Sequence, residues 1–309
     1  MLQKTNTACA KSNSTNPLVS YLLITHNRKQ DLKDAIVSIL NQSYTPIEIV
    51  IVDNNSTDGT PEMIRENFKG QSIRYIRLSE NKGVCGGRNV AIEAAKGEIL
   101  ITIDDDAIID DPNATVKVVN RLSRDPTIGV LAFKVLNYFT HELDKDFFPT
   151  RDKKRAPNEE FEIATFIGVG HAIPRYVYEQ VGLYRDYFPY GHEEFDLALR
   201  ILDTGYKILF FPEVVVYHKA GSRRQRLVGK WSILLENRVK VAIRNLPWKY
   251  VVTTTLIWSI RTFVACRGNV IPVLKAWHNL WKQRHKLKEE RHLIKRETCL
   301  LYTSPSPRD

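Results

Sequence analysis

Apolar runs alternate with helical patterns between residues 18 and 218. Five short, continuous runs rich in Val, Ile and Leu are typical of buried strands, and they cover residues 18–24, 47–53, 73–78, 98–104 and 128–135. Between them apolar positions recur at helical spacing, in residues 29–42, from residue 60, and in 84–95 and 113–124. This alternation predicts an α/β domain with a mainly parallel central sheet covered by helices on both faces.

Polar and acidic residues follow three of these predicted strands. They are THNR at 25–28, DNNSTD at 53–58 and DDD at 104–106. In open α/β sheets, ligands bind outside the carboxyl ends of the strands. The pattern therefore predicts one site, formed by these three segments along one edge of the sheet.

Asp104, Asp105 and Asp106 place three carboxylates together after a buried strand. Adjacent like charges repel, so they require solvent, a helix N-terminus or a cation. Oxygen ligands of this kind suit Mg²⁺ or Mn²⁺, often shared with the phosphates of a ligand. An ordinary acidic loop start is the alternative interpretation of the same three residues.

For five further residues, the sequence alone allows both a structural and a functional role. Asp53 either stabilises its own turn or presents a carboxylate to a base or ribose. Arg88, in the glycine-rich segment 83–89, either meets a phosphate or forms a salt bridge. Glu193 and Glu194 open a helical pattern as dipole partners or as a general base. His218, after the apolar run that precedes it, is either structural or a ligand.

Taken in this order, the segments resemble glycosyltransferase family 2, inverting enzymes of the GT-A fold, over residues 18–218. The resemblance is carried by VSYLLITHNR, SILNQSYTPIEIVIVDNNSTDGT, ENKGVCGGRN, GEILITIDDDA, GHEEFDLALRILDTGY and FFPEVVVYHK. It implies a nucleotide-sugar donor (a UDP-, dTDP- or GDP-sugar), a Mn²⁺ or Mg²⁺ cofactor, and transfer by a single displacement. The sequence departs from the family pattern at Ile24 and His26, where Pro and Tyr are usual, and at His192 before the acidic pair.

The resemblance also implies roles for the donor-binding residues. Asp53 would contact the base or ribose of the donor, with Thr25 and Arg28 nearby. Asp104 and Asp106 match the metal-binding DxD aspartates. The same resemblance places Asp105 near the ribose and His218 with the metal or diphosphate.

The acidic stretch at 191–197 would supply the catalytic base. Glu194 matches the family's acidic residue there, with Glu193 as the second choice, and it would take the proton of the acceptor hydroxyl. Arg88 would neutralise charge that grows on the leaving diphosphate. Residues 141–160, a charged segment, are expected to form a loop that acts as a lid.

Charge divides the chain into two parts. The net charge is +10 overall, but residues 1–218 carry −5 and residues 219–298 carry +15. This division predicts a basic helical extension at 219–298 and no nucleic-acid partner. Residues 250–266 are apolar but interrupted by threonines and Arg261, so a membrane span is not expected. They are either an amphipathic anchor on an anionic membrane surface or part of a helical pair packed on the body.

The two ends of the chain are set apart from these units. Residues 1–17 are polar and predict a disordered lead-in, and residues 299–309 resemble a translated sequencing adapter and are expected to be an artefact. The four scattered cysteines form no disulfide framework and no CxxC pair, which suits the cytoplasm.

The sequence as a whole predicts a metal-dependent inverting glycosyltransferase. Its acceptor would be a hydroxyl group in cell-surface polysaccharide or lipid-linked glycan synthesis, and it would be peripheral on the inner face of the cell membrane. A sugar nucleotidyltransferase, which would release pyrophosphate, is one alternative. A non-catalytic adaptor for membranes or polyanions is another, although it explains only the basic extension.

Overall fold

A computed structural model of the chain describes residues 16–143, 147–149, 155–188, 190–219 and 229–303. Nearly all of the predicted lead-in 1–17 lies outside these ranges, as do parts of the predicted lid 141–160 and of the segment 299–309. Within the described ranges no helix has the length and apolar character needed to cross a membrane.

The centre of the molecule is a nine-stranded sheet in the order β3-β2-β1-β4-β8-β6-β9-β5, with β7 paired to β9. Its strands are β1 (Val19–Thr25), β2 (Ile47–Asp53), β3 (Ile73–Arg77), β4 (Ile99–Ile103), β5 (Ala107–Ile108), β6 (Ile128–Asn137), β7 (Phe161–Glu162), β8 (Gly170–Pro174) and β9 (Lys207–His218). The strands predicted from the five apolar runs are confirmed as β1, β2, β3, β4 and β6. The α/β fold is likewise confirmed.

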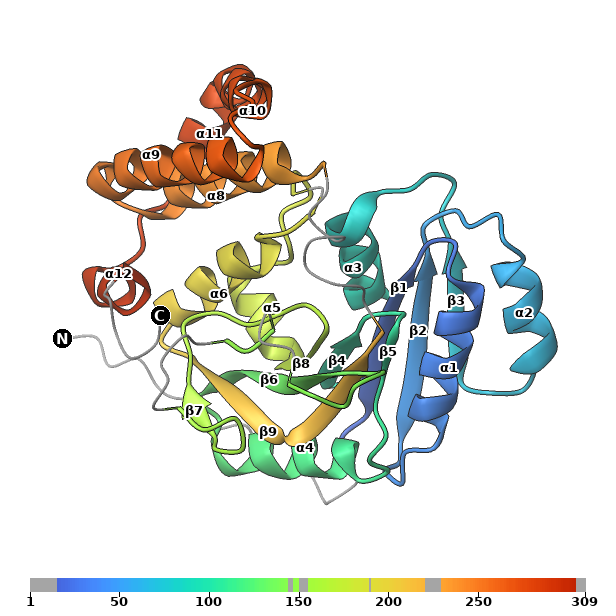
Figure 1. The fold of residues 1–309 in the computed structure, drawn as a ribbon. Coiled ribbons are helices and arrows are strands. Elements are labelled where there is room, and N and C mark those ends of the chain that lie inside the picture. The colour runs from blue at the N-terminus through green and yellow to red at the C-terminus, as the bar shows by residue number, and fades with distance from the viewer. Residues whose placement is uncertain (1–15, 144–146, 150–154, 189, 220–228, 304–309) are drawn as a thin grey trace.

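Helices cover both faces of this sheet (Figure 1). Alternate strand residues point to opposite faces, so one face packs on α1 (Lys29–Leu40), α2 (Thr60–Asn67) and α4 (Ala114–Arg124). The other face packs on α3 (Gly83–Ala94), α5 (Arg175–Val181) and α6 (Glu193–Asp203). Continuous apolar strands are needed because both faces are buried.

The predicted mainly parallel sheet is confirmed, since its longest strand pairings, β1 with β2 and β6 with β9, are parallel, but it also contains antiparallel strands. Strands β3, β2, β1 and β4 are all parallel. Beyond β4, however, β8 runs antiparallel to both β4 and β6, and β5 and β7 run antiparallel to β9. These three short strands lack a long apolar run, so the hydrophobic pattern did not predict them.

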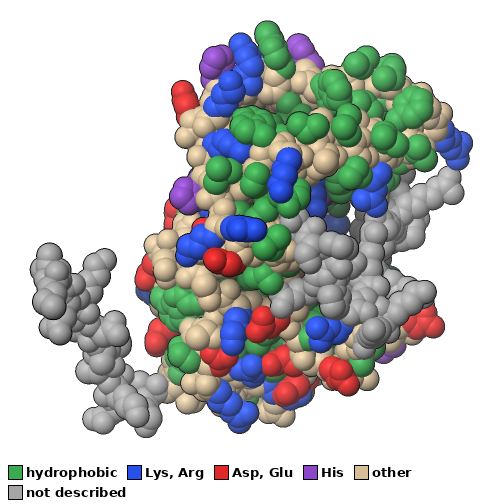
Figure 2. Space-filling view, turned by 90° about the vertical axis from the view of Figure 1, so that its left-hand side faces the viewer, with side chains coloured by type: hydrophobic (Ala, Val, Ile, Leu, Met, Phe, Trp, Pro, Cys, Tyr) green, Lys and Arg blue, Asp and Glu red, His purple; other side chains and the backbone are tan. Residues whose placement is uncertain are grey.

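A second layer of helices follows β9 and lies over α6 (Figure 1). It consists of α8 (Trp231–Asn245), α9 (Trp248–Ala265), α10 (Ile271–Lys282) and α11 (Arg284–Glu289), and α12 (Arg296–Thr303) lies apart from it. The inner side of α8 joins the core of the body, whereas α9 and α10 are largely exposed. Figure 2 shows hydrophobic side chains gathered on the surface of this layer.

Candidate active site

The loops after β1 and β2 form one edge of the site. The parallel register pairs Thr25 with Asp53, so both strands end at the same level. Asn27 then ties the loops together: its backbone N–H donates to Ser56 Oγ at 2.9 Å, and its side-chain Oδ1 accepts from Thr57 N–H at 2.7 Å. Asn27 has φ 54°, a conformation that Asn tolerates better than most residues.

The third strand end brings the aspartates to this edge. Asp104 follows β4, which is parallel to β1, and its N–H donates to Val169 O at 3.0 Å. The chain then turns back into β5, where Ala107 pairs with His218 at the end of β9. This pairing places His218 Nε2 3.2 Å from Asp106 Oδ1. Two residues far apart in the sequence therefore meet because of strand order.

Arg28 supplies positive charge to the same carboxylates. Its guanidinium donates to Asp106 and lies 3.5 Å from Asp105. Burial acts to raise the pKa of Asp106, but the hydrogen bonds and charges of His218 and Arg28 outweigh it and hold that pKa below its usual range. Burial raises the pKa of Asp105 to about 7, although Arg28 opposes the shift.

Asp104, Asp106 and His218 together fit a divalent metal ion. Each offers a ligand atom, and these atoms lie within 4.8 Å of one another. The two carboxylates of this donor set suit Mn²⁺ or Mg²⁺. His218 Nδ1 is buried without a hydrogen-bond partner among the described residues, as are the Nδ1 atoms of His171 and His192.

Arg88 connects this cluster to the acidic start of α6. Its side chain is only 5% exposed, and its guanidinium lies 3.5 Å from Asp104, 3.5 Å from Glu193 and 2.9 Å from Glu194. It also donates to Gly168 O at 3.3 Å and lies over the ring of Tyr184. The predicted meeting of Arg88 with a phosphate stays a prediction, because in the structure its charge is shared among three carboxylates.

Glu193 and Glu194 differ in environment although they are adjacent. The Glu193 side chain is 5% exposed and its Oε2 has no hydrogen-bond partner among the described residues, whereas Glu194 is 12% exposed and bonded to Arg88. Burial and the neighbouring Glu194 carboxylate raise the pKa of Glu193, and Arg88 only partly opposes them. A carboxyl group with a raised pKa holds its proton to a higher pH than usual. Which of the two acids serves as the base stays a prediction.

An open cavity of about 670 Å³ lies at the sheet edge, and neither Glu193 nor Glu194 is among its lining residues. Of the predicted residues, the cavity is lined by Thr25, Arg28, Arg88, Asp104, Asp105, Asp106 and His218. Asp53 does not line it: the residue is fully buried, and its carboxylate accepts from the Tyr75 hydroxyl and from Ser56 N–H at 2.7 Å. A contact of Asp53 with a base or ribose stays a prediction.

Sequence reasoning missed several residues of this cavity. Asn54, which follows Asp53, lines the cavity. The polar turn after β2 was the only sequence feature that could have indicated it. Tyr190 and Lys230 come from distant segments, with the Lys230 ammonium 3.5 Å from the centre of the Tyr190 ring. Gly168 lies against Arg88 and Glu194, where an added Cβ would overlap both side chains. Nothing in the sequence marked Tyr190, Lys230 or Gly168.

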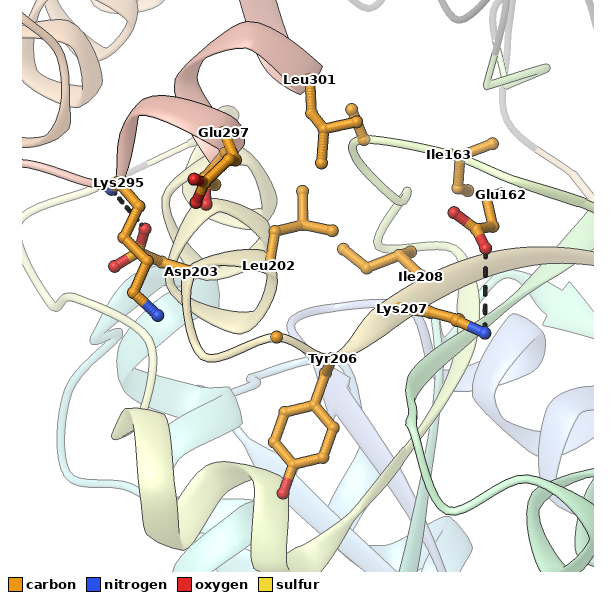
Figure 3. A pocket seen from close by; sticks show the side chains of 13 residues that line it. Glu162, Ile163, Leu202, Asp203, Tyr206, Lys207, Ile208, Lys295, Glu297 and Leu301 are labelled. Atoms are coloured by element: carbon orange, nitrogen blue, oxygen red, sulfur yellow. Dashed lines mark hydrogen bonds and ion pairs between the residues drawn. The ribbon is translucent and has the colours of Figure 1, made fainter.

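A second cavity, of about 270 Å³, lies between α6, β9 and α12 (Figure 3). Figure 3 shows Leu202, Ile208 and Leu301 pointing toward one another across it, with the Lys207–Glu162 ion pair at its side. None of the residues predicted for catalysis, donor binding or metal lines it among the described residues. The candidate chemistry therefore belongs to the sheet edge.

Comparison with known proteins agrees with this geometry. The family described as Glycosyl transferase family 2 matches residues 20–182. An uncharacterized protein of Haemophilus influenzae is 34% identical over 160 residues, which is 50% of this chain and 86% of that protein. The glucosyltransferase WfaP of Escherichia coli is 31% identical over 191 residues, 62% of this chain and 72% of WfaP.

The fold is also found in solved structures of glycosyltransferases. The mannosyltransferase PcManGT from Pyrobaculum calidifontis, solved with GDP-Man and Mn²⁺, aligns with 88% of this chain and 76% of its own at a TM-score of 0.62 and 21% identity. TarS residues 1–349 of Staphylococcus aureus, solved with UDP, align at a TM-score of 0.58 and 16% identity, over 81% and 73%. The chain belongs to glycosyltransferase family 2, has the GT-A fold and is a glycosyltransferase.

Proposed function

We propose that this glycosyltransferase is inverting and metal-dependent, and that it moves a sugar from a nucleoside-diphosphate-sugar to a hydroxyl group. We call Asp104, Asp106 and His218 the metal-type group. One observation carries the proposal: Arg88 contacts Asp104 of this group and also Glu194 in the first turn of α6. A metal-type group beside a candidate base is what a single displacement requires, since one side must stabilise the leaving group and the other must activate the acceptor.

The chain's own residues would divide the chemistry as follows. Glu194 takes the proton of the acceptor hydroxyl while the new bond forms between that oxygen and the anomeric carbon. The bond from that carbon to the diphosphate oxygen breaks on the opposite face. Asp104, Asp106 and His218 would hold Mn²⁺ or Mg²⁺, which supplies the positive charge that the leaving diphosphate needs. Arg88 fixes the position of Glu194, and Arg28 adds charge beside Asp106.

The donor and acceptor are proposed by class. The donor site at Thr25, Arg28, Asp53 and Asp105 would take a UDP-, dTDP- or GDP-sugar. This agrees with GDP-Man in the PcManGT structure and UDP in the TarS structure. WfaP is named as acting on UDP-Glc and a diphosphoundecaprenol acceptor. We extend the class to this chain as a glycan or lipid-linked acceptor, used at the inner face of the cell membrane. Residues 18–218 would form the catalytic domain and 219–298 the membrane-surface extension.

Calorimetric titration tests the donor and metal parts together. The full chain is titrated with UDP, dTDP and GDP, with and without Mn²⁺. We expect one nucleotide to bind in a metal-dependent way, and the Asp106→Ala variant to lose that binding. Asp110→Ala is the matched control, because Asp110 is an exposed acid shortly after β5 and outside the metal-type group. Equal binding by Asp106→Ala and wild type would contradict the proposed metal site.

A further inference from the structure

The outer side of α9 is apolar and faces solvent. Val252, Leu256, Ile260 and Val264 recur every four residues along the helix and are 54–68% exposed. Only Val251 and Thr262 of its 18 residues are buried. Large aliphatic side chains exposed in a continuous stripe are rare on proteins that remain alone in water, and they mark a surface that binds something.

Helix α10 continues the same surface. Ile271, Leu274, Trp277 and Trp281 are exposed on it at helical spacing. Trp277 Nε1 donates to Ser259 Oγ of α9 at 3.1 Å, so the two helices lie side by side. We call the exposed apolar side chains of these two helices the α9–α10 face. Figure 2 shows it as a broad hydrophobic area with Lys and Arg side chains at its border.

The helices that carry the α9–α10 face pack on α8. Val273 and Ala276 of α10 pack on Leu235 and Val239 of α8. Glu236 of α8 then accepts hydrogen bonds from Asn279 at 2.8 Å and Gln283 at 3.1 Å. The inner sides of the helices are thus satisfied within the chain, and only the outer face has no partner among the described residues.

The charge around this face selects its partner. Between Glu236 and Glu289 the sequence has no Asp or Glu, but it has 11 Lys and Arg, of which eight are exposed. A second copy of the chain would bring the same positive charge, so self-association through this face is opposed by repulsion. A bilayer with anionic headgroups is complementary to this face, because its interior is apolar and its surface is negatively charged. Tryptophan side chains favour the membrane–water interface.

We propose that the α9–α10 face docks on a membrane that contains anionic phospholipids, lying in the interface without crossing it. The inference rests on the proposed membrane location of the enzyme, but not on its metal or donor. It also relates the membrane to the active site: the Trp258 ring of α9 packs 5.2 Å from that of His192, the residue directly before Glu193. A lipid-linked acceptor in the same bilayer would then approach the helix that carries Glu194.

Vesicle cosedimentation of the full chain tests the inference. We expect wild type to bind vesicles of phosphatidylcholine with phosphatidylglycerol more tightly than vesicles of phosphatidylcholine alone. The double variant Ile260→Asp, Val264→Asp should bind the anionic vesicles about tenfold more weakly or worse, because it removes apolar burial and adds repulsion. Phe139→Asp is the control, since Phe139 is 72% exposed on the body, outside the α9–α10 face, and should bind as wild type does.

Three outcomes would overturn the inference. They are equal binding of the double variant and wild type, no preference of wild type for anionic vesicles, and self-association of wild type through this face in place of vesicle binding. Both variants are checked for metal-dependent nucleotide binding, which they should retain. If that binding is absent in every protein while vesicle binding behaves as expected, the proposed donor site fails and the docking inference stands.

Discussion

The sheet edge and the α9–α10 face differ in how their like charges are compensated. At the edge, Asp105, Asp106 and Glu193 are buried and share two arginines, Arg28 and Arg88. On the helical layer, many of the positive charges are exposed around an apolar surface. Buried like charges must be compensated inside the molecule, whereas exposed ones can be compensated by a partner. The first arrangement suits a reaction site and the second a docking surface.

The largest effect should come from the candidate base. Glu194→Gln should lower kcat by about 10²–10⁴-fold, because general base catalysis contributes that much, while metal-dependent nucleotide binding stays. Transfer is measured with the donor class found by calorimetry. Glu289→Gln, an exposed acid of the helical layer, should leave kcat unchanged in the same assay. Turnover of Glu194→Gln at the wild-type rate would remove Glu194 from the role.

Two buried arginines, Arg88 at the sheet edge and Arg244 in α8 of the helical layer, sharpen the comparison next. Arg88→Met should lower the free energy of unfolding by about 3–5 kcal/mol, since it leaves buried carboxylates without compensation. Arg244 is 2% exposed but pairs with Glu290, which is 29% exposed. Arg244→Met should therefore cost less, about 1–3 kcal/mol, and leave nucleotide binding unchanged. Urea unfolding measures both, and equal costs would contradict the difference drawn between the regions.

Two glycines separate activity from stability. In Gly168→Ala the new Cβ overlaps the ends of the Arg88 and Glu194 side chains, which can shift. We expect a change in unfolding free energy below about 1 kcal/mol but about a tenfold loss of transfer, because a small misplacement of reacting groups is costly. Gly268→Ala, at φ 85° after α9, should cost about 1 kcal/mol of stability and no transfer. The reverse pattern would show that Gly168 is only structural.

The smallest effect concerns single charges. Lys275→Gln on α10 should weaken binding to anionic vesicles by roughly fivefold at low salt, since each basic residue near the surface contributes about 1 kcal/mol. Lys69→Gln on the body should not change it. High salt should reduce the difference, because screening acts on exposed charges. Equal losses in both variants would indicate a response to net charge alone.

The sequence predicted the three strand ends well and their surroundings less well. Thr25, Asp53 and Asp104 meet because parallel strands with apolar cores must end at a common edge, which a pattern can reveal. Strand β8 was missed, since its five residues carry little signal, and with it the antiparallel pairings to β4 and β6. Arg88 illustrates a different limit. Its type and position suggested a phosphate contact, but its partners come from β4 and α6, and only the packed structure shows them.

The helical layer was harder to predict for a physical reason. In residues 250–266 apolar side chains occur on all sides of the helix, so the sequence left open whether it packs on the body or faces outward. The structure shows that α8 takes the packing role and leaves α9 exposed. Lys230, at the start of α8, lines the active-site cavity although no local pattern marks it.

The pairing of β5 with the end of β9 has a consequence for protein synthesis. Asp104 and Asp106 leave the ribosome long before His218, and Ala107 can pair with His218 only after β9 has been made. A nascent chain therefore cannot assemble the complete metal-type group until nearly the whole body has emerged. Helix α8, whose inner side completes the core of the body, follows β9, and the apolar helices α9 and α10 come after it. Most of the catalytic body can therefore fold in water before the segment that we expect to bind lipid is exposed.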